Sequence, residues 1–305
     1  MANGGKNTSG TLLRELQLGL DSTIEHFDAA YIGPYMELFD RVACPKGFYE
    51  IEQVAGMGPA AMRNEGGTLT AFDTINQDFN PRYTIYSYEK GARATYEAIA
   101  DNMYRDLVGD MAKCIVTSHN VNKDLQAAVL LNSCTTTTWG DGVAMLSTAH
   151  PIQAGGTNSN RLSPDLDLSM DALQQADILI RQFVLPSGLL GDYEGENLVI
   201  PLQLRFIANV ILGSKYNPQG ASNAINPVVN MGIVKGVVEW RRLTSATTWF
   251  MSTNRKEKGL ILAEKMGIET KTFQDDYTRD TICNAWTRFR FLLGDHRCIA
   301  GSVGP

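Results

Sequence analysis

The segment ARATYEAIADNMYRDLVGDMAKCIVTSHNVNKDLQAAVLLN (Ala92–Asn132) carries the clearest helical pattern in the chain. Hydrophobic residues recur at every third or fourth position, and the segment contains no proline. At about 1.5 Å per residue the helix would span about 60 Å, which is long for a compact domain. The polar residues 118–120 mark a point where it could break. The residues expected on its apolar face are Ile99, Met103, Leu107, Met111, Cys114 or Ile115, Leu125 and Val129.

The chain before this helix changes character twice. Residues 1–46 begin with a polar, glycine-rich stretch and are predicted to form an N-terminal arm that leads into short helices. Residues 47–91 are predicted to form an extended loop, because FYEIEQV and RYTIYSYEK alternate bulky and polar residues as strands do, with the glycine-rich GMGPAAMRNEGG between them. An excursion of this composition has too few large hydrophobic residues to build a core of its own.

Helices and strands are both predicted after residue 132, so the fold class is α+β. A helix is expected over Ser169–Phe183, with Ser169 as its N-cap and Leu173, Ala176, Ile180 and Phe183 on one face. The strand LVIPL is expected to lead into a helix, RFIANVIL. The last third reads mostly as strands, in the segments GIVKGVVEWRRL, TTWFMST, KGLILAEKMG, ICNAWTRFRFLL and HRCIAGSV.

Composition narrows the class of protein. The chain has 305 residues, 44% of them hydrophobic, and a formal net charge of −6. This charge does not favour a sequence-independent nucleic-acid binder. The five cysteines are scattered and show no CxxC pair, which favours reduced thiols in a cytosol. Neither a secretory leader nor an apolar run long enough for a membrane span is recognisable, so we expect no membrane association.

Candidate catalytic residues are few. Cys134, Asp141 and His150 fall in one loop-rich segment and could form a Cys/His nucleophile pair, but nearness in sequence fixes no geometry. Ser147 lies three residues before His150 without a GxSxG motif. The four histidines follow no metal-binding spacing, and the glycines of the loop lack the Lys-Ser/Thr of a phosphate loop. We therefore expect no enzyme activity, no cofactor and no metal.

Arginine and aromatic residues mix near the C-terminal end of the sequence, where two interpretations are open. Arg279, Arg288, Arg290 and Arg297 surround Trp286, Phe289 and Phe291, which could form a stacking platform for nucleic acid. In a strand, however, Thr287, Phe289 and Phe291 would project to one face as core, and Trp286, Arg288 and Arg290 to the other, where they could pair with acidic residues of a neighbour. The second interpretation is favoured, since the overall charge does not support strong phosphate binding.

The order of parts resembles the HK97-like major capsid fold of tailed phages. Three local stretches of sequence are similar to the Mu-like major head subunit family: LSTAHPI (Leu146–Ile152), SMDALQQADILIRQF and NLVIPLQLRFIANVIL. The resemblance implies an N-terminal arm over 1–46 and an extended β-hairpin loop over 47–91. It also implies a peripheral domain with a long spine helix over 92–150, an axial domain over 151–265, and C-terminal strands of the peripheral domain over 266–305.

This resemblance also implies a function. It predicts a major capsid protein that self-assembles into hexamers and pentamers of an icosahedral shell around double-stranded DNA, which it does not read. Portal, scaffolding and decoration proteins are the further partners it suggests. The protein would be made and assembled in the host bacterial cytoplasm and end in the virion capsid. The loop residues expected to pack on a neighbouring subunit are Tyr49, Ile51, Phe72, Phe79, Tyr83 and Tyr86.

Two further expectations concern a covalent link from the extended loop and the alternative functions of the protein. Between Gly47 and Glu89 there is no lysine, so an isopeptide link from the loop, known in some members of the fold, is not expected. The alternative functions are a soluble Cys/His hydrolase and another phage structural protein, such as a tail tube or decoration protein. The long helix argues against the tube and decoration proteins, which are usually small and rich in strands.

Overall fold

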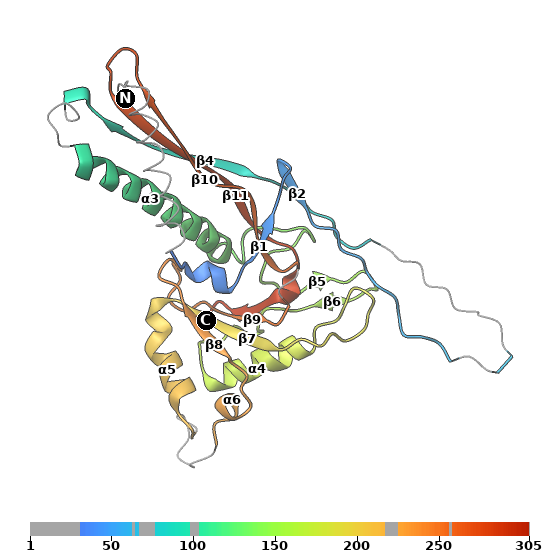
Figure 1. The fold of residues 1–305 in the computed structure, drawn as a ribbon. Coiled ribbons are helices and arrows are strands. Elements are labelled where there is room, and N and C mark those ends of the chain that lie inside the picture. The colour runs from blue at the N-terminus through green and yellow to red at the C-terminus, as the bar shows by residue number, and fades with distance from the viewer. Residues whose placement is uncertain are drawn as a thin grey trace, which may run out of the picture.

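The computed structural model describes residues 31–62, 65–66, 77–97, 104–216, 225–255 and 258–304. Two four-stranded sheets organise this part of the chain. The first sheet is drawn out along a long helix, the second carries shorter helices, and the arms of the extended loop project away from both (Figure 1). The chain therefore mixes helix and sheet, as expected. Residues 1–30 of the predicted N-terminal arm lie outside the described part.

The first sheet has the strand order β1-β10-β11-β4. Its strands are β1 (Asp40–Ala43), β10 (Leu260–Gln274), β11 (Thr281–Leu293) and β4 (Tyr86–Ala94), and only the β1–β10 pair is parallel. Along β11 buried and half-buried residues alternate, so Thr287 and Phe289 are buried while Arg288 and Arg290 are partly exposed. The core interpretation of the arginine and aromatic segment is thus confirmed for this strand.

The long helix α3 (Tyr104–Asn132) lies along this sheet (Figure 1). It has 29 residues and no break at residues 118–120. The predicted start was wrong, because Ala92–Ala94 belong to strand β4. Residues 98–103, which include two of the residues expected on its apolar face, lie outside the described residues. At about 1.5 Å per residue the described helix spans about 43 Å.

The buried face of α3 differs in part from the predicted one, since Ile115 is buried as expected and Cys114 is exposed. Leu125 and Val129 are exposed, and the polar residues His119, Lys123 and Asp124 are buried instead. Each of these three has a partner on a strand or in a loop beyond the helix. Burial of polar groups is tolerated when their hydrogen bonds are satisfied, which a pattern of hydrophobic residues does not reveal.

The second sheet has the strand order β12-β9-β7-β8. Its strands are β12 (Ile299–Ser302), β9 (Trp249–Thr253), β7 (Gly195–Ile200) and β8 (Gly236–Glu239). Helices α4 (Met170–Arg181), α5 (Arg205–Gly213) and α6 (Pro227–Asn230) accompany it (Figure 1). The step from β7 through the short turn η2 (Leu202–Leu204) into α5 confirms the predicted strand-to-helix transition.

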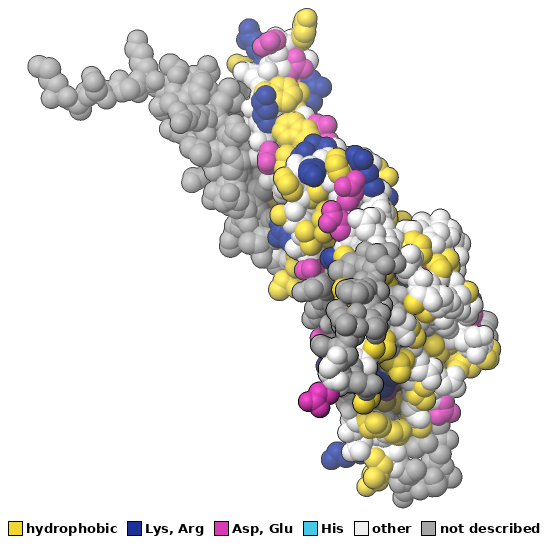
Figure 2. All heavy atoms as spheres, turned by 90° about the vertical axis from the view of Figure 1, so that its right-hand side faces the viewer, with side chains coloured by type: hydrophobic (Ala, Val, Ile, Leu, Met, Phe, Trp, Pro, Cys, Tyr) yellow, Lys and Arg dark blue, Asp and Glu magenta, His cyan; other side chains and the backbone are white. Residues whose placement is uncertain are grey.

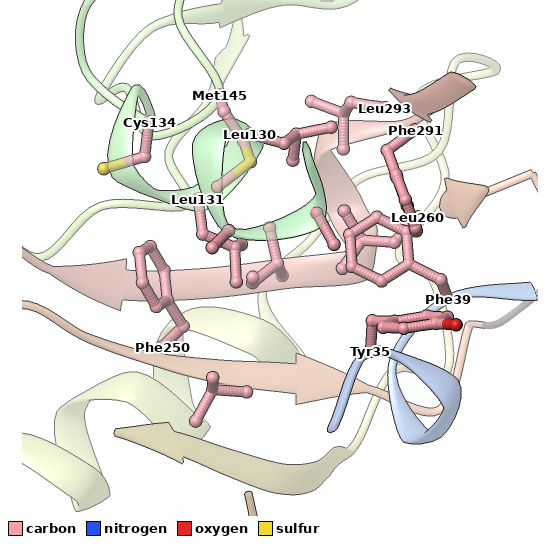
Figure 3. Close-up of a cluster of buried hydrophobic side chains, with 14 of the residues drawn as sticks. Tyr35, Phe39, Leu130, Leu131, Cys134, Met145, Phe250, Leu260, Phe291 and Leu293 are labelled. Carbon is pink, nitrogen blue, oxygen red and sulfur yellow. The ribbon is translucent and has the colours of Figure 1, made fainter. Parts of the chain in front are cut away.

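One hydrophobic core lies where the two sheets meet. Tyr35 and Phe39, in and after η1 (Pro34–Glu37), pack their rings edge-on against Phe291 of β11. The end of α3, with Leu130 and Leu131, lies over the same cluster (Figure 3). Residues 31–43, expected to be part of an arm, therefore contribute to the folded body.

The sheets divide the chain differently from the predicted domain ranges. The predicted boundary at residue 265 falls inside β10, a single strand of the first sheet. Strand β12, assigned with 266–305 to the peripheral part, instead pairs antiparallel with β9 in the second sheet. Hydrogen bonding joins strands that are distant in sequence, so the chain crosses between the sheets more often than a linear division allows.

Helix α4 offers a direct test of the predicted cap. Ser169 accepts a hydrogen bond from the backbone N–H of Ala172 at 3.1 Å, as an N-cap should. We expect Ser169→Ala to lower the free energy of unfolding by about 1 kcal/mol, since one backbone donor of the first turn loses its partner. Urea denaturation measures this change. Ser169→Asp, which keeps an acceptor, should stay close to wild type, and an equal loss in both variants would contradict the capping role.

Candidate assembly surfaces

The base of the extended loop is a short antiparallel ladder. Strand β2 (Phe48–Glu50) pairs with β3 (Arg82–Thr84), with Tyr49 opposite Tyr83. Beyond it, a single bridge joins Val54 to Gln77. The tyrosine hydroxyl of Tyr83 donates to the carbonyl of Leu293 at 3.1 Å, and burial raises the pKa of Tyr83 to about 12. The loop is thus fastened to β11 at its base.

Two of the six loop residues predicted to pack on a neighbour are core residues of the same chain. Ile51 is 1% exposed and Tyr83 is 8% exposed, in a cluster that includes Ile261 and Leu292. The prediction for these two was wrong, because the base of the loop lies against the first sheet and finds apolar partners there. Sequence alternation alone could not show which sheet covers them.

The other four predicted loop residues differ in their surroundings. Tyr49 and Phe79 are half-buried, and Tyr86 is 50% exposed with the guanidinium of Arg290 over its ring at 4.8 Å. Phe72 lies outside the described residues.

The arms of the loop expose apolar side chains that the sequence reasoning did not single out. Val54 is 58% exposed, Met57 is 53% exposed and Met62 is 95% exposed. Methionine is flexible and polarisable, and it suits surfaces that adapt to a partner. The signal available in the sequence was the presence of two methionines within a glycine-rich segment, where no core of the loop's own could cover them.

A second apolar surface lies on and around α5. Its exposed residues are Leu202, Phe206, Ile207 and Val210, and Phe206 reaches 78% exposure. Helix α5 and the extended loop lie on opposite sides of the molecule (Figure 1). Contiguous exposed apolar residues mark interaction surfaces in soluble proteins.

The described charged side chains do not gather into a patch of one sign on the face drawn in Figure 2. In the space-filling view, side chains of both signs are interspersed with hydrophobic ones over the narrow upper part of the molecule (Figure 2). Several arginines of the C-terminal segment are already engaged within the chain. Arg290 donates to the carbonyl of Thr84, and Arg297 is 3% exposed, so Arg297 is unavailable to nucleic acid. The described helices include no segment long and apolar enough to cross a membrane.

The proposed Cys/His pair is not assembled. Cys134 is buried, and burial raises the pKa of its thiol to about 11, so the nucleophilic thiolate is scarce at neutral pH. Within the described residues, no hydrogen bond joins Cys134 to His150. Asp141 does contact His150, with 2.5 Å between Oδ2 and Nδ1, but the other ring nitrogen of His150 faces Oδ1 of Asn160 and not a thiol or hydroxyl.

The histidines are closer than their spacing in sequence indicates. His150 and His296 stack with ring centroids 4.0 Å apart and an interplanar angle of 3°. Together with Asp141 they are the described group of His, Cys, Asp or Glu side chains whose donor atoms come within 4.8 Å of one another. The nitrogen lone pairs of two parallel rings lie in two separate parallel planes, whereas one ion bound by both rings must lie near both planes. The arrangement therefore does not fit a metal centre.

Three solved structures that share this fold come from a virus-like particle, a procapsid and a mature capsid. A virus-like particle from Pyrococcus furiosus has a TM-score of 0.51 at 10% identity, over 93% of this chain and 97% of that one. The procapsid of bacteriophage JBD30 has a TM-score of 0.54 at 13% sequence identity, and the match covers 97% of this chain and 76% of that one. The mature capsid of bacteriophage PhiM1 has a TM-score of 0.56 at 14% sequence identity, and the match covers 89% of this chain and 86% of that one. The fold is thus that of a capsid subunit.

A family match makes the identification more specific. Residues 80–302 match the sequence model of a family described as phage capsid protein. The chain belongs to this family, and it is a major capsid protein of the virion. Membership in this family favours a structural rather than an enzymatic role. No curated protein sequence matches the chain at a significant level.

Proposed function

We propose that this major capsid protein has the HK97-like fold, closest to the Mu-like major head subunits, and forms hexamers and pentamers of an icosahedral shell. In this proposal the first sheet and α3 form the peripheral domain, and the second sheet with its helices forms the axial domain. The shell assembles in the host cytoplasm and encloses double-stranded DNA without reading its sequence. The chain performs no catalysis.

The observation that carries this proposal is the pair of apolar surfaces on opposite sides of the subunit. A surface that meets a different surface on the next copy makes a head-to-tail contact, and such contacts close into rings when the rotation allows. The loop arms, with Met57 and Met62, would lie on one neighbour, and the α5 surface would meet another. Tyr49, Phe79 and Tyr86 are the aromatic residues at the loop base that would contribute, and Phe72 joins them as a proposal.

Partners beyond the protein itself follow from the same role. Portal, scaffolding and decoration proteins are proposed on the resemblance of the sequence to capsid subunits. The formal charge of −6 suits a container that should not hold its DNA tightly. An isopeptide link from the loop is not proposed, because the loop has no lysine between Gly47 and Glu89. Reinforcement of the shell would then be non-covalent.

Assembly is tested with a loop substitution that spares the fold. We expect the purified protein, alone or with a scaffold, to form shells or rings visible by electron microscopy and sedimentation velocity. Met62→Asp should abolish these assemblies, since a carboxylate would replace an apolar contact at a site that is 95% exposed in the subunit. Its thermal unfolding as a subunit should match that of wild type.

Met62→Leu is the matched control, because it keeps an apolar side chain of similar size. It should assemble as wild type does. A wild-type protein that stays monomeric with and without scaffold would contradict the capsid role. Shells formed by Met62→Asp at the wild-type yield would contradict only the role of the loop.

A further inference from the structure

A buried polar cluster lies between the base of the extended loop and the segment that precedes β12. His150 stands at its centre, in the short strand β5 (His150–Pro151), which pairs with β6 (Thr157–Asn158). Its side chain is 1% exposed. The titratable and charged groups around it come from the loop base, the 139–143 turn, the end of β9 and the turn η3 (His296–Cys298), and they are Asp78, Asp141, Arg255, Asp295, His296 and Arg297.

Asn160 fixes the proton on one ring nitrogen of His150. The amide nitrogen of Asn160 donates to the carbonyl of Met145 at 2.7 Å and to those of His296 and Ile299 at 3.2 Å. Its Oδ1 accordingly faces the other way and accepts from the backbone N–H of Ser147 at 2.9 Å. Nε2 of His150 lies 3.1 Å from the same Oδ1. An amide oxygen only accepts, so this nitrogen must carry hydrogen.

Asp141 fixes the proton on the other ring nitrogen. Nδ1 of His150 lies 2.5 Å from Oδ2 of Asp141, and the second carboxylate oxygen accepts from the backbone N–H of Val143 at 3.0 Å. Burial would raise the pKa of Asp141, but the hydrogen bonds from His150 and Val143 outweigh it and lower the pKa overall. An ionised carboxylate only accepts, so Nδ1 must also carry hydrogen.

The stacked partner ring is neutral. Burial, together with the nearby His150, lowers the pKa of His296 to about 3, although Asp295 opposes the change. Nε2 of His296 is buried and has no hydrogen-bond partner, so a charged form would lack an acceptor there. An uncharged ring stacked on a charged one avoids placing two positive charges 4.0 Å apart.

The formal charges of the cluster then balance. Burial raises the pKa of the Asp78 carboxyl, while Arg297 at 3.9 Å favours its ionised form. With Asp78 ionised, Asp78, Asp141 and Asp295 contribute three negative charges, and Arg255 and Arg297 contribute two positive charges. We infer that His150 is held as a buried imidazolium, and that its proton supplies the missing positive charge of the joint between the extended loop and the C-terminal segment. Buried charges require such compensation.

Other contacts show what this joint fastens. Nε2 of Gln53, in the first arm of the loop, donates to the carbonyl of Gly294 at 2.8 Å. Arg297 lies 3.9 Å from Asp78 in the returning arm and donates to Asp295 at 2.9 Å. Loss of one proton from His150 would leave a ring nitrogen without hydrogen facing either Oδ1 of Asn160 or Oδ2 of Asp141, and would remove the positive charge beside Asp141. The contacts that fasten the base of the extended loop to the C-terminal segment therefore depend on the protonation of His150.

Nitrogen NMR of the histidine rings tests this inference on the full-length, unassembled protein labelled with 15N-histidine. Each of the four histidines is assigned from a His→Gln variant. At pH 7, His150 should show two protonated ring nitrogens and His296 only one. A single protonated nitrogen on His150 would overturn the inference, whatever the variants do. Added Zn²⁺ should leave both spectra unchanged, and shifts of both rings on its addition would overturn the inference in favour of a metal site.

Asp141→Asn provides the second arm of the test. Without the carboxylate, His150 should become neutral at pH 7, and hydrogen exchange of the amides of residues 51–54 and 77–79 should be faster by about tenfold or more. Asp276→Asn, at an exposed site in the β10–β11 turn, is the matched control and should change neither measurement. A doubly protonated His150 in Asp141→Asn, or unchanged exchange at the loop base, would overturn the link between the proton and the loop.

A neutral His296 predicts that the free energy of unfolding decreases as the pH falls below about 6.5. The pKa of His296 is about 3 in the folded chain, below its ordinary value of 6.5, so the unfolded chain binds this proton first as pH falls. The contribution of His296 is complete above about pH 6.5 and is lost progressively between about pH 6.5 and pH 3. The urea midpoint of wild type should therefore fall more steeply from pH 6.5 to pH 4 than that of His296→Gln. Parallel profiles would contradict a neutral His296.

Discussion

Phe289→Ala should lower the free energy of unfolding of the subunit by about 3–5 kcal/mol. Phe289 lies in β11 with 0% exposure. Its ring stacks on Tyr88 of β4 at 4.7 Å and meets Phe291 edge-on at 5.8 Å. Truncation would remove the transfer free energy of the ring and leave a cavity between strands that cannot collapse without breaking the sheet. Urea denaturation of the unassembled protein measures the loss.

The same chemical change at an exposed site is the control. Phe206→Ala, on α5, removes a ring that is 78% exposed, so the free energy of unfolding should change by no more than about 0.5 kcal/mol. Under the proposed function, however, Phe206→Ala should weaken assembly. A small loss in Phe289→Ala, or an equal loss in the two variants, would show that β11 is not packed as described.

Lys123→Ala should also be strongly destabilising, by about 3–5 kcal/mol. Nζ of Lys123, on the buried face of α3, lies 3.2 Å from Oε1 of Glu264 in β10, and their side chains are 7% and 6% exposed. Removal of the ammonium would leave the buried carboxylate with Arg41 alone, whose side chain is 72% exposed. An incompletely paired buried charge costs more than the pair contributed. Chemical denaturation again measures the change.

Two further variants separate this effect from a general weakening of the helix. Lys113→Ala, on the same helix, breaks an exposed ion pair with Asp110 and should cost less than about 1 kcal/mol. The double variant Lys123→Met with Glu264→Leu removes both buried charges and should recover most of the stability. If the double variant is no more stable than Lys123→Ala, the loss has a cause other than the unpaired carboxylate.

Sequence patterns correctly predicted those features of helices and strands that are determined by residues close together in the chain. The alternation of Thr287, Phe289 and Phe291 placed a buried face on β11, and Ser169 marked the start of α4, because both signals act within a few residues along the chain. The capsid resemblance, drawn from the order of such elements, agrees with the family match over residues 80–302. The start of α3 was missed, since Ala92–Ala94 complete a strand whose partner, β11, lies far along the sequence.

The arrangement of the assembly surfaces and of the buried cluster depended on contacts between distant segments. Ile51 lies between Glu50 and Glu52, as a residue on one face of an exposed strand would. Packing against the first sheet makes Ile51 and Tyr83 core residues and leaves Tyr86 at the surface. Likewise, the sequence contains His150 and His296 at positions that follow no motif, and only the return of the chain to β12 stacks them. The sequence thus defined helices, strands and the family, because short-range periodicity and residue order encode them. Long-range packing determined which side chains of the loop base are buried and which remain exposed to meet another subunit.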